Sequence, residues 1–160
     1  LGMLAALSAL HSRGIVHRDL KPSNVLVTQH GVKLLDFGVA QTADTEPSPG
    51  QPVGGNLTQT GMVVGTPGYI APERLTGEPF DARSDLFAVG AILFEMLAGR
   101  PAFSGRNMIE ILHAVLHEQP PALTGSPAIA AADRVIRRAL AKRNAQIAKL
   151  LATTETQPAA

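Results

Sequence analysis

Three short polar motifs occur in a fixed order along this chain, and they constrain its fold more than any other feature. The first occupies residues 17–24, the second is Asp36-Phe37-Gly38, and the third is Ala71-Pro72-Glu73. A single aspartate before a turn is most often a capping residue. Three polar motifs in this order are harder to explain by local capping, so we interpret them together as parts of one site.

Between the first and second motifs, two runs rich in β-branched residues flank a short turn. The runs are residues 25–28 and 32–35, and residues 29–31 separate them. This pattern predicts a β-hairpin in which Gly31 supplies a positive φ angle. Functional residues are therefore expected at both ends of the hairpin.

Two acidic residues, Asp19 and Asp36, lie on either side of this predicted hairpin, with Lys21 and Asn24 between them. Such a set can converge on a divalent metal and a phosphate. Carboxylate and amide oxygens are hard ligands, which suit magnesium. The residues alone therefore indicate a metal and phosphate site near the hairpin.

Most of the remaining chain is predicted to be helical, because apolar residues recur there at helical spacing. One helix begins near Asp81 or Ser84, ends at Gly99, and is apolar nearly all round. This pattern indicates a helix buried in the core. The other apolar stripes are Met3, Leu4, Leu7 and Leu10 before Gly14; Met108, Ile109, Leu112, Val115 and Leu116; and Ile129, Ala132, Val135, Ile136, Ala139 and Leu140.

Two segments lack such a pattern. Residues 41–61 are rich in Thr, Pro, Gly and Gln, which predicts a mobile loop long enough to be regulatory. Residues 144–160 end without periodicity and are expected to form a divergent end and a disordered tail.

The composition limits the classes of protein to which the chain can belong. Its 160 residues, 45% of them hydrophobic, suffice for one domain or one lobe. The formal net charge of +1 gives no field that would attract nucleic acid or an anionic membrane. The absence of cysteine excludes disulfides and thiolate metal sites, and it fits a cytosolic setting.

The longest apolar run and a basic cluster both receive ordinary structural interpretations. Residues 86–94 make up about half of the roughly 20 residues that cross a bilayer, so they predict a core helix and no membrane segment in this chain. The basic residues have helical spacing and no interleaved aromatics, which favours a solvated helix face over nucleic-acid binding. They are Arg134, Arg137, Arg138, Lys142 and Arg143.

The order and spacing of the three motifs resemble the signature set of the protein kinase family. The resemblance covers residues 1–143, and Val39-Ala40-Gln41 together with residues 65–74 is similar to bacterial members. It implies a mainly α structure with a small β-hairpin, which would be the C-terminal, helical lobe of the kinase-like fold with the N-terminal lobe absent. The implied parts are a catalytic loop at 15–24, a metal loop at 36–38, an activation segment at 36–73 and a helical subdomain at 81–143.

The resemblance assigns the chemistry to four residues. Asp19 corresponds to the catalytic base that accepts the proton of the substrate hydroxyl, and Lys21 to the lysine that contacts the transferring phosphate of ATP in serine/threonine kinases. Asn24 and Asp36 correspond to the ligands of Mg²⁺ or Mn²⁺. The implied activity is transfer of the ATP γ-phosphoryl group to Ser/Thr hydroxyls of proteins.

Other positions are expected to support the fold, regulate the activity or contact the substrate. Arg18 precedes the base, as in kinases whose activation loop is ordered by phosphate, so Thr58 and Thr60 are candidate phosphosites. The alternative that both threonines are ordinary loop hydroxyls stays open. Residues similar to the substrate loop are Thr66, Gly68 and Tyr69, and residues with an expected structural role are His17, Phe37, Gly38, Glu73 and Asp85. The histidines His11, His30, His113 and His117 share no evident geometry with acidic partners and are given no role.

The chain also departs from the family pattern. The Gly-rich strand, the strand lysine and its glutamate partner have no counterpart in these residues, so the chain alone is expected to be inactive and to bind ATP weakly. Residues 144–147 stand where relatives carry a Pro and then an Arg that pairs with the equivalent of Glu73. Either another arginine replaces that partner or this corner is loose.

Two functions are compatible with this sequence. One is a partial serine/threonine kinase domain in the cytoplasm, with ATP and protein substrates as partners. The other is a non-catalytic, pseudokinase-like interaction module. The intact residues Asp19, Lys21, Asn24 and Asp36 favour the first, whereas the missing lobe favours the second. A membrane anchor in the complete protein is left open.

Overall fold

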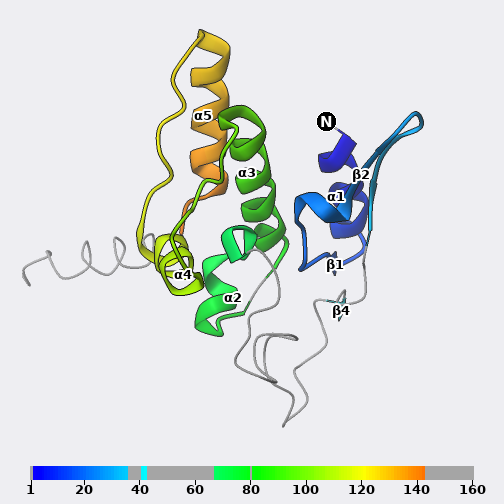
Figure 1. The fold of residues 1–160 in the computed structure, drawn as a ribbon. Coiled ribbons are helices and arrows are strands. Elements are labelled where there is room, and N and C mark those ends of the chain that lie inside the picture. Colours follow the sequence, from blue (N-terminus) through cyan, green and yellow to red (C-terminus); the bar gives the residue numbers. More distant parts are fainter. Residues whose placement is uncertain (1, 36–40, 43–66, 80, 143–160) are drawn as a thin grey trace, which may run out of the picture.

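The computed structural model describes residues 2–35, 41–42, 67–79 and 81–142, and helices dominate these segments (Figure 1). The mainly α architecture with a small antiparallel hairpin, as predicted from the sequence, is confirmed. The elements are α1 Gly2–His11, β1 Ile15–Val16, η1 Pro22–Asn24, β2 Val25–Thr28, β3 Gly31–Leu34, β4 Gln41–Thr42, η3 Pro67–Tyr69, α2 Pro72–Thr76, α3 Ala82–Ala98, α4 Met108–His117 and α5 Pro127–Ala139.

The predicted hairpin is formed by β2 and β3. Its register pairs Val25 with Leu34 and Thr28 with Gly31, and Gly31 has the predicted positive φ, at 109°. The second strand begins at Gly31, one residue earlier than predicted. The Thr28 hydroxyl closes the turn by donating to the Gly31 carbonyl at 2.8 Å.

A second two-stranded sheet was not predicted. In it β1 pairs antiparallel with β4, so that Val16 lies opposite Gln41. The sequence predicts that the mobile loop starts at Gln41, and this prediction is wrong for residues 41–42, which form a strand. Strands of two residues are too short to carry an alternating pattern, and the pairing to a distant partner decides their conformation.

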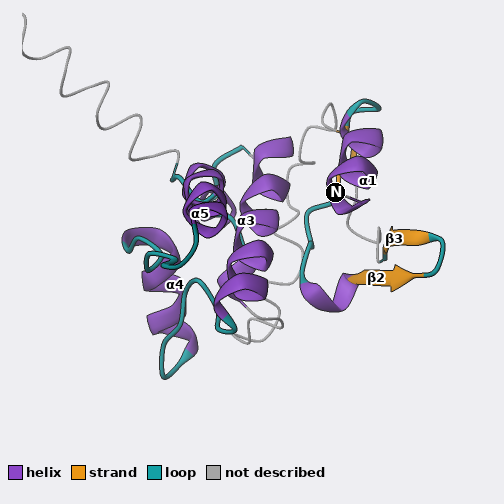
Figure 2. Ribbon diagram, turned by 90° about the horizontal axis from the view of Figure 1, so that it is seen from above, coloured by secondary structure: helices purple, strands orange, loops and turns teal. Residues whose placement is uncertain are grey.

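The central helix is α3, which lies between the α1–hairpin region and the pair α4 and α5 (Figures 1 and 2). Asp81 caps its N-terminus, because a carboxylate oxygen accepts from the Arg83 amide at 2.8 Å. Gly99 ends it in the left-handed conformation, with φ of 67°. Both boundaries were predicted. No helix in the described segments is long and apolar enough to span a membrane.

Apolar side chains on two faces of α3 make two core clusters. Toward α1 and the hairpin, Ala88, Val89 and Ile92 pack with buried residues of α1, the predicted catalytic loop and β3. On the other side, the α3 residues Phe87, Ala91 and Phe94 pack with α4 and α5. The helix therefore joins the segment that carries Asp19 to the helical remainder of the chain. The partners are Leu7, Leu20 and Leu34 in the first cluster, and Phe103, Ala114, Val115, Ile136 and Leu140 in the second.

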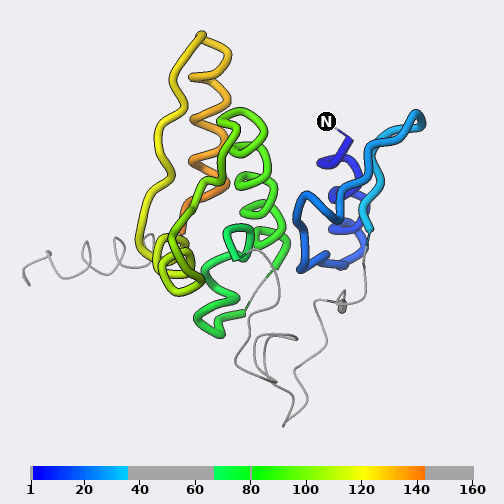
Figure 3. Tube along the Cα trace, viewed as in Figure 1, coloured from blue at the N-terminus to red at the C-terminus, as the bar shows by residue number. Residues whose placement is uncertain are grey.

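Helices α3 and α5 approach closely at Gly90. A Cβ atom at this position would lie 2.9 Å from Cβ of Ala139 and 3.1 Å from Cγ of Leu140, so a larger residue would push the helices apart. The extended connection from α4 to α5 runs alongside α5 (Figure 3), and the Leu123 amide donates to Asp133 at 3.0 Å. Two members of the predicted apolar stripes, Ile109 and Val135, lie instead on the surface at 77% and 65% exposure.

The interpretation of the basic cluster as a solvated helix face is wrong for Lys142. This side chain is 7% exposed, and its Nζ donates to the Ala114 carbonyl at 3.1 Å and to the Glu118 carbonyl near the end of α4. Its ammonium also lies 5.5 Å from the centroid of the Phe103 ring. Carbonyls at a helix end attract a cation, which sequence spacing alone does not reveal. Arg134 and Arg138 are exposed, as predicted.

The stability of the protein is expected to rise between pH 8 and pH 10.5 because of Lys142. Burial lowers the pKa of this lysine from 10.5 to about 8, so in this range the unfolded chain binds the proton more tightly than the folded chain. Each pH unit of depression corresponds to about 1.4 kcal/mol, which gives an increase of at most about 3 kcal/mol. Urea unfolding at both pH values should show this increase in the wild type and lose it in Lys142→Met. An equal pH dependence in both proteins would contradict the assignment.

Candidate active site

The loop at residues 15–24, which the sequence predicts to be the catalytic loop, is held in place by buried side chains on both sides of Asp19. His17 is fully buried, and its Nε2 lies 3.0 Å from the carbonyl oxygen of Leu35, the residue before Asp36. Leu20 is 3% exposed and packs in the cluster between α1, β3 and α3. The buried residues His17 and Leu20 thus anchor the loop, while Asp19 and Lys21 remain partly accessible.

Asp85, in the first turn of α3, binds the backbone just before Asp19. Its two carboxylate oxygens accept from the amides of His17 at 2.8 Å and of Arg18 at 2.9 Å, and the residue is 1% exposed. Arg18 has a φ angle of 72°, which is costly for a residue other than glycine. A buried carboxylate that accepts both amides offsets this cost, so Asp85 holds the loop in the shape that presents Asp19.

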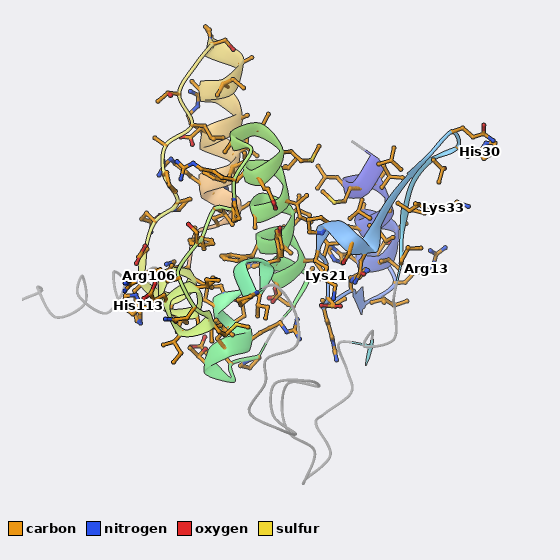
Figure 4. All side chains as sticks on the ribbon, in the orientation of Figure 1. Arg13, Lys21, His30, Lys33, Arg106 and His113 are labelled. Atoms are coloured by element: carbon orange, nitrogen blue, oxygen red, sulfur yellow. The ribbon has the colours of Figure 1, made fainter. Side chains whose placement is uncertain are left out.

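The structure brings Asp19, Lys21 and Asn24 together. Lys21 Nζ lies 2.8 Å from Oδ2 of Asp19. The Asn24 amide nitrogen donates to the Asp19 carbonyl at 2.8 Å and to its Oδ2 at 3.2 Å. Lys21 lies near one end of α3, in the centre of the view in Figure 4. A carboxylate beside an ammonium group and a buried amide is an arrangement that can accept a proton and bind a phosphate.

Asn24 offers one hard donor atom for a divalent metal. It bonds to Asp19 through its amide nitrogen, so its amide oxygen is the atom that suits a hard cation. Asp36, Phe37 and Gly38 lie outside the described residues. Within the described segments, no group of three His, Cys, Asp or Glu side chains could hold a metal by itself. The amide oxygen of Asn24 is therefore the described atom of the predicted metal-ligand pair that suits magnesium.

Sequence reasoning missed Arg74, which approaches the catalytic loop from α2. Its Nη1 donates to the carbonyl oxygen of Arg18. Burial lowers the pKa of Arg74, and the carboxylates of Asp19, Asp85 and Glu73 oppose this shift. Burial and the charge of Arg74 likewise lower the pKa of Arg18. The only sequence signal is a charged residue directly after the third motif, which does not indicate a contact 56 positions away.

His11 was given no role, and this is corrected, since its Nε2 lies 2.8 Å from Oδ2 of Asp85. Asp85 therefore joins α1, the catalytic loop and α3 at one carboxylate. His113 also has an acidic neighbour, with Nδ1 3.6 Å from the Glu118 carboxylate, and its ring lies 4.7 Å from that of His117. His30 lies at the tip of the hairpin, far from His113 on α4 (Figure 4).

Of the predicted substrate-loop residues, Gly68 and Tyr69 lie in η3 and border an apolar pocket. Gly68 is buried and Tyr69 half-buried. The Tyr69 hydroxyl donates to the Glu95 carboxylate, and burial together with this bond raises the tyrosine pKa. The pocket also borders Phe103 and Ile111 and has a volume of about 190 Å³. Thr66, Thr58 and Thr60 lie outside the described residues.

Glu73 is buried at 4% exposure and accepts a hydrogen bond from the Ser84 hydroxyl at 2.6 Å. Within the described residues no Lys, Arg or His nitrogen lies within ion-pair distance of it. The sequence left open whether another arginine replaces the usual ion-pair partner of Glu73. In the described residues no arginine lies within 4 Å of its carboxylate. The hydroxyl of Ser84 and the more distant charge of Arg74 accompany the buried carboxylate instead.

Comparison with known proteins identifies the class. The protein kinase domain profile matches residues 1–153, so the chain belongs to the protein kinase family. Bacterial serine/threonine kinases are among its relatives. It is 45% identical to the serine/threonine-protein kinase Pkn1 of Myxococcus xanthus over 145 residues. This match covers 86% of this chain and 20% of that protein.

Two further relatives carry similar names. The probable serine/threonine-protein kinase PknB of Bifidobacterium longum is 40% identical over 147 residues, or 89% of this chain and 20% of that protein. The serine/threonine-protein kinase PkaA of Streptomyces coelicolor is 42% identical over 139 residues, or 83% of this chain and 24% of that protein. The chain thus spans about a fifth of the length of the curated relatives it matches.

Proposed function

We propose that this chain is the C-terminal, helical lobe of a serine/threonine kinase domain that transfers the γ-phosphoryl group of ATP to Ser or Thr hydroxyls of proteins. The lobe would comprise residues 1–143, with the metal loop at 36–38 and the activation segment at 36–73. Family membership supports the use of ATP, a divalent metal and protein substrates. A cytoplasmic location of this domain is part of the proposal.

The observation that carries the proposal is the joint contact of Lys21 and Asn24 with the carboxylate of Asp19. In the proposed reaction Asp19 orients the substrate hydroxyl and accepts its proton. Lys21 stays next to this carboxylate and places its positive charge where the transferred phosphoryl group carries negative charge. Asn24 fixes the orientation of Asp19 through its amide hydrogens.

The metal and nucleotide would be held by few residues of this chain. We assign the amide oxygen of Asn24 and the carboxylate of Asp36 as magnesium ligands, because both are hard oxygen donors. Bound magnesium neutralises charge on the phosphates of ATP. Thr66 with Gly68 and Tyr69 would form the substrate loop, and Arg18 would bind a phosphate on Thr58 or Thr60.

A phosphorylation assay of the full-length protein tests this function. With magnesium and radiolabelled ATP, label is expected on peptides that offer Ser or Thr, and matched peptides that offer only Tyr should stay unlabelled, because Lys21 marks Ser/Thr specificity. Transfer should stop when EDTA removes the metal. Equal labelling of tyrosine peptides would refute the assigned specificity, and an absence of labelling on every peptide would favour a non-catalytic module.

A further inference from the structure

Arg74 contacts the catalytic loop at the residue that precedes the proposed base. It lies in α2, next to Glu73, and its Nη1 donates to the carbonyl oxygen of Arg18. That carbonyl belongs to the peptide group that joins Arg18 to Asp19. A guanidinium bound there acts directly on the plane of this peptide, which in turn sets the direction of the Asp19 side chain.

The backbone at Arg18 is held from two sides. Its amide donates to Oδ1 of Asp85 at 2.9 Å, and its carbonyl accepts from Arg74. With a φ of 72°, this residue occupies the left-handed region, from which an unrestrained side-chain-bearing residue would relax. Asp85 accepts from the backbone amides of His17 and Arg18, but it does not bind the peptide group between Arg18 and Asp19. Arg74 supplies the restraint on that side.

The carboxylates around Arg74 favour its positively charged form. Three carboxylates, Asp19, Asp85 and Glu73, favour its charged form in spite of burial. A planar guanidinium keeps its charge when buried and donates in a fixed geometry, which an amide side chain does not reproduce.

We propose that Arg74 is a positioning residue for phosphoryl transfer, which fixes the peptide between Arg18 and Asp19 and so orients the base. This inference rests on the proposed function. It makes the docking of α2, which directly follows the substrate loop, a requirement for a competent catalytic loop. Displacement of α2 would withdraw the guanidinium and leave the Asp19 peptide free to rotate.

The test compares Arg74→Gln with Arg74→Lys in the full-length protein, with Arg138→Gln as a matched control on the exposed face of α5. Arg74→Gln is expected to lower kcat by about 10- to 100-fold, the scale of a misplaced catalytic group, while KM for ATP changes by less than about threefold. Arg74→Lys, which keeps a charged donor, should recover part of kcat. The control should retain wild-type values.

Hydrogen exchange of residues 15–24 provides a readout that does not depend on activity. Exchange in this loop should accelerate in Arg74→Gln and remain at the wild-type rate in the control. Unchanged kcat and unchanged exchange would overturn the proposal. Equal losses of kcat and thermal stability in both Arg74 variants would assign Arg74 to structural support only. If exchange is faster in Arg74→Gln than in the wild type, but the wild-type protein has no transferase activity, the loop contact is retained and the proposed function is refuted.

Discussion

Asp19→Asn is expected to abolish phosphoryl transfer by the full-length protein while ATP affinity stays within about threefold of the wild type. The amide of asparagine cannot accept the proton of the substrate hydroxyl, and loss of a general base typically costs about 10²- to 10⁴-fold in rate. The contacts with Lys21 and Asn24 both reach Oδ2 of Asp19, so an amide oxygen in that place preserves much of the local geometry. The measurements are single-turnover transfer of the γ-phosphoryl group and equilibrium binding of magnesium-ATP.

Val27→Ala serves as the control for this variant. Val27 is 78% exposed on β2, outside the set of contacts around Asp19, so its substitution should not remove a proton acceptor. If Asp19→Asn turns over at a rate similar to the wild type, then Asp19 is not the base. If ATP affinity falls along with the rate, then Asp19 acts on nucleotide binding, and the division of roles between Asp19 and Asn24 is wrong.

The parts of this structure that sequence predicts well are those encoded by local patterns. The caps at Asp81 and Gly99 bound α3 as predicted, because a capping carboxylate and a left-handed glycine act within one turn. Gly31 fixes the hairpin turn in the same way. The proximity of Asp19, Lys21 and Asn24 also follows from short sequence separation.

The contacts that escaped prediction join residues far apart in the chain. Arg74 reaches Arg18, and His11 reaches Asp85, across separations of 56 and 74 residues. Lys142 looked like a surface residue by spacing but binds the end of α4. Periodicity reports which face of a helix is apolar, but it does not report which carbonyl or carboxylate lies opposite a long charged side chain.

Asp85→Asn is expected to destabilise the catalytic loop by about 3 kcal/mol and to lower kcat. The substitution places an NH₂ group where one carboxylate oxygen now accepts from a backbone amide, so a buried donor faces another donor. It also removes a buried charge that compensates the nearby guanidiniums, and breaking such an arrangement typically costs about 3 to 5 kcal/mol. Native-state hydrogen exchange of residues 15–24 in the full-length protein measures this local free energy.

Asp81→Asn provides the matched control, because it makes the same chemical change at the beginning of the same helix. Asp81 caps α3 by accepting from the Arg83 amide, and asparagine caps a helix about as well as aspartate. The control is therefore expected to change the local free energy by less than about 0.5 kcal/mol. A similarly small effect of Asp85→Asn would mean that the left-handed backbone at Arg18 persists without a carboxylate, and Asp85 would lose its role as the anchor of the loop.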